Sequence, residues 1–197
     1  APPAGTIVLG YAEQCGNDEQ QETETAHVAG GCFWCTEAIF VRLRGVRAVA
    51  PGYAGGTVER PGYEQVSSGT TGHAETVEIT YDPSEIAFRD LLTVFFATHD
   101  PTTRDRQGDD VGTQYRSAIF YTTPEQREAT LAFIAELSEE SPAPIVTEVR
   151  RLERFYHAED YHQRYYEEHQ GEPYCQAVIR PKLDKLDAQF KALMKQV

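Results

Sequence analysis

The segment 30–37, GGCFWCTE, constrains this chain more than any other part of its sequence. Its two glycines allow a tight turn, and residues 26–29 before them are predicted to form a short strand. The apolar residues that follow, up to Gly45, have the spacing of a short helix closed by a glycine. The sequence therefore predicts a strand, a cysteine-bearing loop and a helix, with Cys32 at or just before the helix N-terminus.

A cysteine in this position has more than one interpretation. The N–H groups and the dipole at a helix N-terminus favour a thiolate, and such sites lower a cysteine pKa by one or more units from about 8.5. A buried cysteine is also a common small core residue. A zinc site needs further ligands, and neither Cys15 nor Cys175 has a partner at ligand spacing. The spacing leaves redox or nucleophilic chemistry and a structural role about equally open, with zinc the weaker alternative.

Composition excludes several classes of protein. A net charge of −13 over 197 residues argues against a nucleic-acid binder, because these proteins carry basic patches. No run of 18 apolar residues is present, so we expect no membrane span. Four cysteines do not make a disulfide scaffold. The length fits one domain, which we place at 26–197.

Residues 1–25 differ from the rest of the chain. They are acidic and turn-rich, and the first basic residue is Arg42. We predict a disordered acidic lead-in. The predicted compartment is the cytoplasm, or the cell envelope if the lead-in is the remnant of a processed precursor. Cys15 lies within this segment and is more plausibly incidental than catalytic.

Periodicity after the lead-in predicts strands alternating with helices. The alternation indicates the α+β class, specifically a ferredoxin-like (split βαβ) two-layer α/β sandwich with a mixed sheet. Two long irregular stretches, 54–72 and 99–115, interrupt the pattern, and loops of such length are often functional. Strands are expected at 26–29, 46–53, 76–81, 117–121 and 145–149, and later helices at 84–96, 124–140, 157–170 and 181–197.

Polar and aromatic residues at the edges of these elements are candidates for chemistry. Glu75 opens a strand, and Asp110 and Tyr115 precede another. Tyr63 lies in the first long loop. Without further context, Glu75 is a solvated strand end, Asp110 a turn residue and the tyrosines half-buried packing residues. The three histidines of the predicted helix 157–170 have poor spacing for chelation and are expected to be packing or surface residues.

Together these motifs resemble those of the methionine sulfoxide reductase A family, which reduces the S epimer of methionine sulfoxide. The resemblance runs from about Val28 to Arg180, and several distinct motifs occur in the right order. The motifs are GCFW at 31–34, GYAGG at 52–56, TGHAE at 71–75, HDPT at 99–102, RQG at 106–108, GTQYRS at 112–117 and AEDYHQ at 158–163.

The resemblance implies a role for each candidate. Cys32 matches the nucleophile that attacks the sulfoxide sulfur and becomes a sulfenic acid. Glu75 matches the acid that protonates the sulfoxide oxygen, which requires a raised pKa and therefore burial. Tyr63 and Tyr115 match the tyrosines that hydrogen-bond this oxygen, and Asp110 a polar partner that orients the substrate.

The resemblance also implies a pocket and a second thiol. Phe33 and Trp34 match the walls that hold the methyl group of the substrate. Cys175 matches the position that resolves the sulfenic acid to a disulfide in many members. Cys35 stands where glycine is commoner and is a competing resolver, so our order is Cys175, then Cys35, then Cys15.

The implied reductant is thioredoxin or another dithiol, with no metal and no organic cofactor. Free and protein-bound methionine sulfoxide are the implied substrates, and a monomer is expected. One rival is a general thiol–disulfide oxidoreductase that uses Cys32 and Cys35. A second is an interaction module with structural cysteines. The dispersed carboxylates and tyrosines have no role in either rival.

Overall fold

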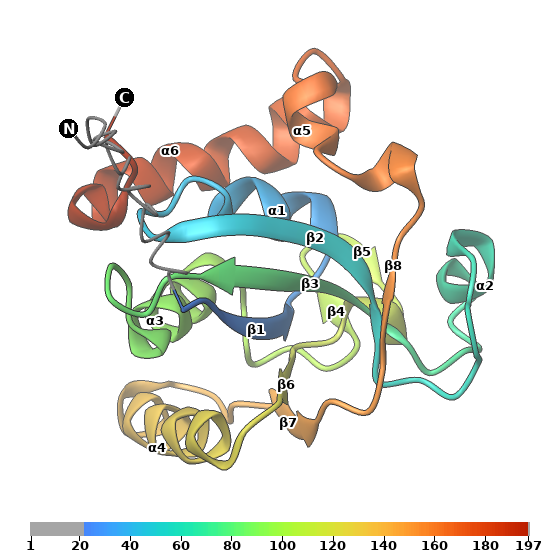
Figure 1. Cartoon of the computed structure of the whole chain (residues 1–197). Helices are drawn as coiled ribbons and strands as arrows, with labels where there is room; N and C mark the ends of the chain where they lie inside the picture. Colours follow the sequence, from blue (N-terminus) through green and yellow to red (C-terminus); the bar gives the residue numbers. More distant parts are fainter. Residues whose placement is uncertain (1–21, 197) are drawn as a thin grey trace, which may run out of the picture.

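A six-stranded mixed sheet with helices packed on it forms the frame of the protein (Figure 1). The structure is a computed structural model that describes residues 22–196. The predictions for Cys15 and for the lead-in up to residue 21 lie outside these residues. The α+β class and the mixed sheet are confirmed. No helix of the described residues is long and apolar enough to cross a membrane.

Strand β3 lies between β1 and β2 and is antiparallel to both, so β1 and β2 run parallel to each other. The sheet order is β7-β6-β1-β3-β2-β8, and only β6 and β7 pair in parallel. The strands are β1 (Glu24–Ala29), β2 (Val46–Ala54), β3 (Ala74–Tyr81), β6 (Ala118–Tyr121), β7 (Glu148–Arg151) and β8 (Phe155–His157). The main predicted strands are confirmed, and β1 begins two residues before the predicted boundary at 26.

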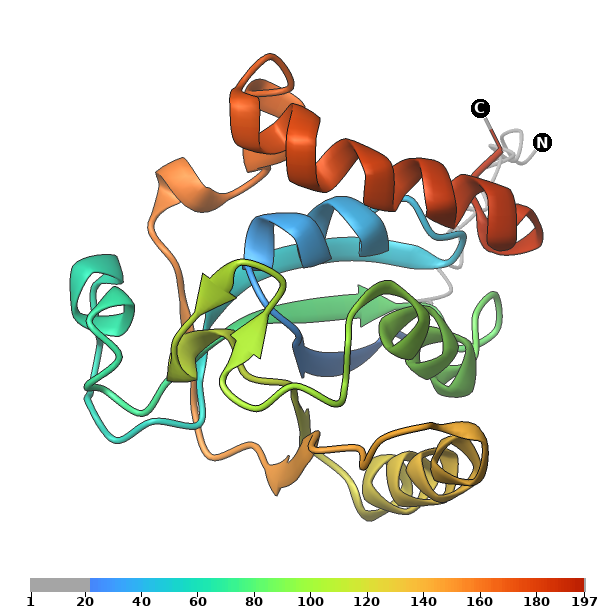
Figure 2. The same ribbon diagram turned by 180° about the vertical axis from the view of Figure 1, so that it is seen from behind.

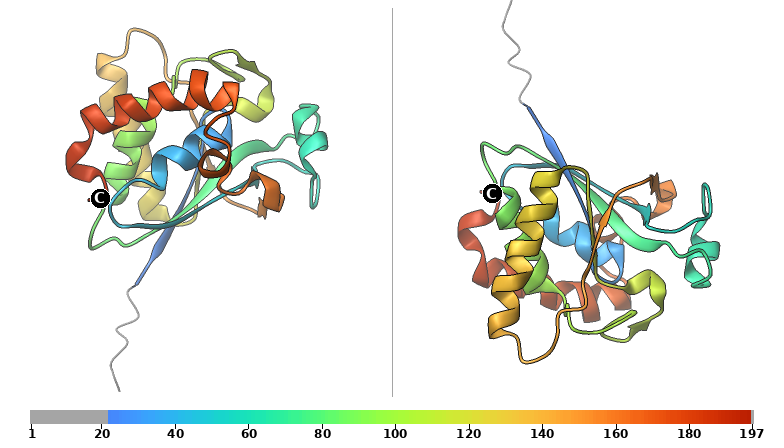
Figure 3. Two further views of the ribbon diagram at one scale, coloured as in Figure 1. Left: turned by 90° about the horizontal axis from the view of Figure 1, so that it is seen from above. Right: turned by 90° about the horizontal axis from the view of Figure 1, so that it is seen from below.

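The helices bury their apolar faces against the sheet and one another. Helix α1 (Phe33–Phe40) packs on β2 and β3, and α6 (Arg180–Gln189) packs on α1 (Figure 2). Helix α3 (Phe88–Thr98) and α4 (Pro124–Glu140) lie side by side (Figure 3). The bounds of α4 match the prediction, because Thr123 caps the helix by accepting a hydrogen bond from the Gln126 N–H and Pro124 fits its first turn.

The predicted helix over 157–170 is wrong. This stretch holds the end of β8, a 3₁₀ turn (Asp160–His162) and the short helix α5 (Tyr165–Glu168). Arg164 has a left-handed backbone with φ of 56°, which interrupts a helix. The Gln163 amide donates to the carbonyl of Pro51 at 3.0 Å, so this side chain ties the segment to β2. The stretch 157–170 therefore does not form one continuous helix, and its short helix α5 packs on α1.

Other predicted bounds shift at their ends. Helix α1 ends at Phe40, well before Gly45, and the last long helix ends at Gln189 where 181–197 was expected. The last predicted strand, 145–149, corresponds to β7, which begins three residues later at Glu148. Its start is set by the pairing of Glu148 with Ala118 of β6. The two long irregular stretches contain α2 (Tyr63–Ser67), the hairpin β4 (Arg106–Gln107) and β5 (Asp110–Val111), and a 3₁₀ turn (Thr113–Tyr115).

Candidate active site

Cys32 occupies the N-cap position of α1, directly after the turn at Gly30 and Gly31. Gly31 has φ of +94°, and a Cβ atom there would lie 2.7 Å from the Gln107 side chain. A Cβ atom on Gly30 would lie 2.8 Å from the Phe95 ring. Both glycines are needed because the turn passes between packed side chains. Cys32 itself is only 9% exposed, so the predicted loop delivers a nearly buried thiol to a helix N-terminus.

Glu75 lies beside this turn, near the start of β3. Its Oε2 accepts a hydrogen bond from the N–H of Phe33 at 3.0 Å, and the residue is 2% exposed. Burial raises the pKa of this carboxyl to about 8, an effect that the Phe33 bond opposes and the charge of Asp110 reinforces. The carboxyl is therefore mostly protonated at neutral pH. The backbone N–H of Phe33 holds one oxygen of Glu75, and the protonated carboxyl can act as a proton donor.

Cys35 is the second thiol at this helix end, and its N–H donates to the carbonyl of Cys32 at 3.1 Å. Burial raises the pKa of the Cys32 thiol. The neighbouring Cys32 side chain lowers the pKa of Cys35 to about 7. The two thiols titrate as a pair, because the S–H that remains stabilises the first thiolate formed. The pair can therefore carry one negative charge near neutral pH.

Tyr63 and Tyr115 lie partly buried at the ends of two short elements, α2 and the 3₁₀ turn. Burial raises the pKa of each phenol, and the charge of Glu75 adds to the effect. Both groups stay protonated and can donate a hydrogen bond to an oxygen near Glu75. Asp110 in β5 accepts a hydrogen bond from the Tyr174 hydroxyl at 3.1 Å. The structure thus brings four elements distant in sequence to the N-terminus of α1.

The two aromatic residues of the motif differ in exposure. Phe33 is 1% exposed, and its ring lies 5.1 Å from that of His162. Trp34 is partly exposed; its ring stacks on Tyr165 at 3.7 Å, and its Nε1 donates to His162 Nδ1 at 3.1 Å. Trp34 is therefore the more accessible of the two rings, and Phe33 belongs to the core.

Cys175 lies in a turn that packs against α1. It is fully buried in a π-helical turn (Cys175–Ile179) that leads into α6, and burial raises the pKa of its thiol. Within the described residues, Cys32, Cys35 and Cys175 are free thiols, and no hydrogen bond joins Cys175 to Cys32. The same residues contain no cluster of histidine, cysteine, aspartate or glutamate that could hold a metal ion.

Sequence reasoning missed several residues that position the site. Glu159 accepts hydrogen bonds from the N–H of Tyr63 at 2.8 Å and the hydroxyl of Tyr53 at 2.9 Å, which anchors α2. Glu37 accepts from the N–H of Arg164 at 2.7 Å. Tyr174 contacts both Cys35 and Asp110. Glu37 follows the cysteine motif directly and Tyr174 precedes Cys175, so proximity to a motif was the available signal.

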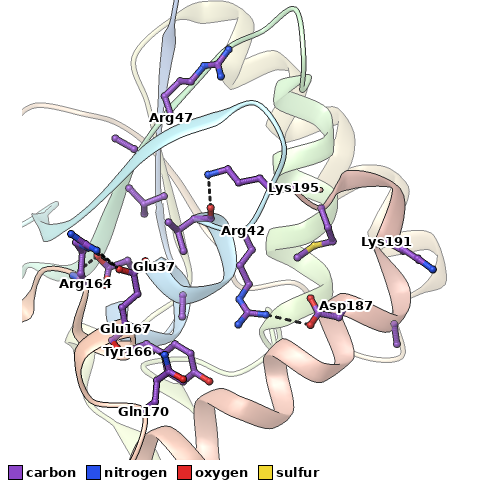
Figure 4. A pocket seen from close by; sticks show the side chains of 16 residues that line it. Glu37, Arg42, Arg47, Arg164, Tyr166, Glu167, Gln170, Asp187, Lys191 and Lys195 are labelled. Carbon is purple, nitrogen blue, oxygen red and sulfur yellow. Dashed lines mark hydrogen bonds and ion pairs between the residues drawn. The ribbon is translucent and has the colours of Figure 1, made fainter. Parts of the chain in front are cut away.

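A cavity of about 1120 Å³ lies toward the other end of α1, between β2, α6 and the C-terminal residues (Figure 4). Figure 4 shows the exposed ion pair of Arg42 and Asp187 at its edge and Lys195 reaching the carbonyl of Val41. None of the predicted site residues lines this cavity. The predicted site residues therefore lie away from this cavity, whereas the buried Glu37 borders it.

Comparison with known proteins points to one family. The family model described as peptide methionine sulfoxide reductase matches residues 24–194. The chain is 54% identical to the peptide methionine sulfoxide reductase MsrA of Haloquadratum walsbyi over 168 residues, covering 85% of this chain and 97% of that protein. It is 55% identical to that of Chromobacterium violaceum over 173 residues, covering 87% and 98%.

Solved structures agree with the sequence relatives. Methionine sulfoxide reductase A of Corynebacterium diphtheriae superposes with a TM-score of 0.69 at 36% identity, covering 77% of each chain. Reduced Mxr1 of Saccharomyces cerevisiae gives 0.73 at 31% identity, covering 80% of this chain and 91% of that one. Mxr1 in complex with Trx2 gives 0.52 at 23% identity, covering 75% and 87%, and at that identity supports the fold alone.

Proposed function

Because this chain belongs to the peptide methionine sulfoxide reductase A family, we propose that its reduction of methionine (S)-sulfoxide to methionine uses Cys32 as nucleophile and Glu75 as acid. One observation carries the proposal. A buried carboxyl with a pKa of about 8 is hydrogen-bonded to the amide that directly follows Cys32. The Cys32 thiol and the Glu75 carboxyl, a proton donor, are thus held at the same turn, as the reaction requires.

In the proposed first step, the Cys32 thiolate attacks the sulfoxide sulfur and Glu75 gives its proton to the sulfoxide oxygen. An S–S bond between Cys32 and the substrate forms transiently. It breaks, together with the S–O bond of the substrate, as a new S–O bond forms on the Cys32 sulfur. The hydroxyl group passes to Cys32, which becomes a sulfenic acid, and the substrate leaves as methionine. The substrate is reduced by two electrons and Cys32 is oxidised by two.

The remaining residues are proposed to bind the substrate. Tyr63 and Tyr115 donate hydrogen bonds to the sulfoxide oxygen, and Asp110 helps to orient the substrate. Trp34, supported by Phe33, contacts the methyl group. Support comes from the partial exposure of Trp34 and from the raised phenol pKa values around Glu75. A site with polar groups on one side and an apolar wall on the other discriminates between epimers.

The sequence predicts Cys175 ahead of Cys35 as the resolving residue. We now propose the reverse order, with Cys35 as the residue that resolves the sulfenic acid and Cys175 as a second acceptor. The N–H of Cys35 donates to the carbonyl of Cys32 at 3.1 Å, and the Cys32 side chain lowers the pKa of Cys35 to about 7. The fully buried Cys175 would need its turn to move first. Cys35 loses its proton as its sulfur attacks the sulfenic sulfur, a disulfide forms and water leaves.

Thioredoxin is proposed as the reductant of this disulfide, in keeping with the complex of Mxr1 with Trx2. A free dithiol would serve in its place. Free and protein-bound methionine sulfoxide are both proposed substrates, and the protein is proposed to act as a monomer without a metal or an organic cofactor.

For the fold, we propose that the sheet core follows the ferredoxin-like plan of a two-layer α/β sandwich. The order β6-β1-β3-β2 with antiparallel neighbours supports this assignment. Strand β3 lies between β1 and β2 of the unit β1–α1–β2. Along the chain, α1 follows β1 and α3 follows β3.

Consumption of racemic methionine sulfoxide tests the proposed residues, with dithiothreitol as reductant. The unsubstituted protein should consume the S epimer only, and Cys32→Ser should consume neither epimer. Cys35→Ser should still produce about one methionine per protein in the absence of reductant. Full turnover by Cys32→Ser would contradict the nucleophile. Survival of both epimers with folded, reduced protein would instead favour disulfide exchange through Cys32 and Cys35.

A further inference from the structure

The hydroxyl of Tyr174 lies between a reacting sulfur and a carboxylate. It is 3.7 Å from the Sγ atom of Cys35 and 3.1 Å from Oδ2 of Asp110. The Tyr174 ring is packed edge-on against Trp34, with ring centres 6.0 Å apart. The three polar groups come from α1, β5 and the turn before α6, so the fold assembles them from three distant parts of the chain.

The direction of the hydrogen bonds follows from the number of protons available. Tyr174 donates its single hydroxyl proton to Oδ2 of Asp110. The lone pairs of the hydroxyl oxygen are then left for the S–H of Cys35. The groups form a chain in which Cys35 donates to Tyr174 and Tyr174 donates to Asp110.

From this chain we propose that Tyr174 is a further catalytic residue, which relays the Cys35 proton to Asp110 while the Cys32–Cys35 disulfide forms. The inference rests on the proposed function, in which Cys35 resolves the sulfenic acid. As Cys35 attacks the sulfenic sulfur of Cys32, its proton passes to the oxygen of Tyr174, and the hydroxyl proton passes to Asp110. The new S–S bond forms as the S–O bond breaks.

The proton count closes on the leaving group. Hydroxide leaves the Cys32 sulfur and takes up the proton held by Asp110, so that water departs and the Asp110 carboxylate is restored. The disulfide is at the same oxidation level as the sulfenic acid, two electrons above the reduced thiols. Tyr174 begins and ends as a neutral phenol, in agreement with the burial that raises its pKa. It conducts a proton and does not store one.

Tyr174→Phe is the sharpest test, because it removes only the hydroxyl and keeps the ring against Trp34. The experiment uses Cys15→Ser/Cys175→Ser protein, in which Cys35 is the only resolving thiol. Reduced protein is mixed with one equivalent of methionine (S)-sulfoxide without reductant. Methionine formation reports the first step, and loss of the second thiol per protein after an acid quench reports disulfide formation. Tyr121→Phe, a hydroxyl deletion on β6, is the matched control.

We expect Tyr174→Phe to slow disulfide formation about tenfold or more relative to methionine formation. The sulfenic acid should accumulate and be trapped by dimedone, whereas Tyr121→Phe should leave the ratio of the two rates unchanged. An unchanged ratio in Tyr174→Phe overturns the relay, and so does an equal slowing of both steps, which marks a structural role. If the parent protein forms no methionine at all, the proposed function fails instead.

Discussion

Two buried carboxyl groups, Glu37 in helix α1 and Glu75 in β3, have different neighbours. Glu75 accepts a hydrogen bond from the N–H of Phe33, and Glu37 accepts one from the N–H of Arg164. Burial raises the pKa of Glu75 to about 8 and that of Glu37 to about 7. By burial and pKa alone, either group would qualify as a catalytic acid.

Their neighbours separate them. Glu75 faces Cys32, whose pKa its charge raises, and the phenols of Tyr63 and Tyr115. Glu37 holds the segment that carries Tyr165, which stacks on Trp34, and its second oxygen has no protein partner. Glu37 also borders the large cavity, and Glu75 does not (Figure 4). A raised pKa and a nearby hollow therefore do not identify the acid. The electrostatic effect of Glu75 on the Cys32 thiol supports Glu75 as the proposed acid.

The largest expected effect is on the chemical step. Glu75→Gln should lower the rate of methionine formation in a single turnover by about 10²–10⁴-fold, because the amide keeps an acceptor for Phe33 but has no proton to give. Glu37→Gln is the matched control, and its rate of methionine formation should fall by far less. A Glu75→Gln protein within about threefold of wild type would break the distinction between the two carboxyls.

The next effect is on the apolar wall. Glu37→Ala leaves the Arg164 N–H without its partner, which costs about 1–3 kcal/mol of unfolding free energy. It should also loosen Tyr165 against Trp34 and raise KM several-fold more than it lowers kcat. Trp34 is the only tryptophan in the sequence, so its fluorescence reports the change directly. Glu37→Gln should restore the wild-type spectrum, and a spectrum unchanged in Glu37→Ala would exclude the support role.

Both carboxyls should also affect how stability depends on pH. Each pKa is higher in the folded protein than the value of about 4.3 in an unfolded chain. Their stabilising contribution is fully present below that value and is lost as pH rises through about 7 and 8. Urea unfolding at pH 5 and 8.5 should show a smaller fall for Glu75→Gln than for wild type, by on the order of 1–3 kcal/mol. An identical fall in both proteins would show that Glu75 is ionised at neutral pH.

The smallest effect is expected at the cavity. Arg42 and Asp187 form a solvent-exposed ion pair at 3.3 Å, and such pairs contribute about 0–1 kcal/mol. Arg42→Ala should change unfolding free energy by no more than that and kcat/KM by less than about twofold. A large loss of activity would mean that the cavity takes part in the reaction.

Local patterns in the sequence predicted much of this arrangement. The two glycines and the apolar run placed Cys32 at a helix N-terminus, and strand alternation placed Glu75 at the start of β3. Thr123 and Pro124 fixed the start of α4. These features depend on neighbouring residues, which is why a single sequence reveals them. The roles of Tyr63, Tyr115 and Asp110 came from family resemblance and remain proposals.

Features set by tertiary contacts could not be predicted. The left-handed Arg164 is held where Glu37 binds its N–H, a contact between residues 127 positions apart. The depth at which Cys175 is buried depends on the packing of its turn against α1. The Tyr174 contacts with Cys35 and Asp110 join three separate segments. No local pattern encodes such contacts, so the helix predicted over 157–170 was wrong and Tyr174 was missed.

The pH dependence of methionine formation in a single turnover tests the distinction between the two carboxyls most directly. It should be measured for wild type, Glu37→Gln and Glu75→Gln between pH 6 and 10. Wild type and Glu37→Gln should share a fall in rate above about pH 8, where Glu75 loses its proton. Glu75→Gln should form methionine slowly at every pH, and its rate should show no fall above about pH 8. A Glu75→Gln profile that keeps the fall, or a Glu37→Gln profile that loses it, would contradict Glu75 as the acid.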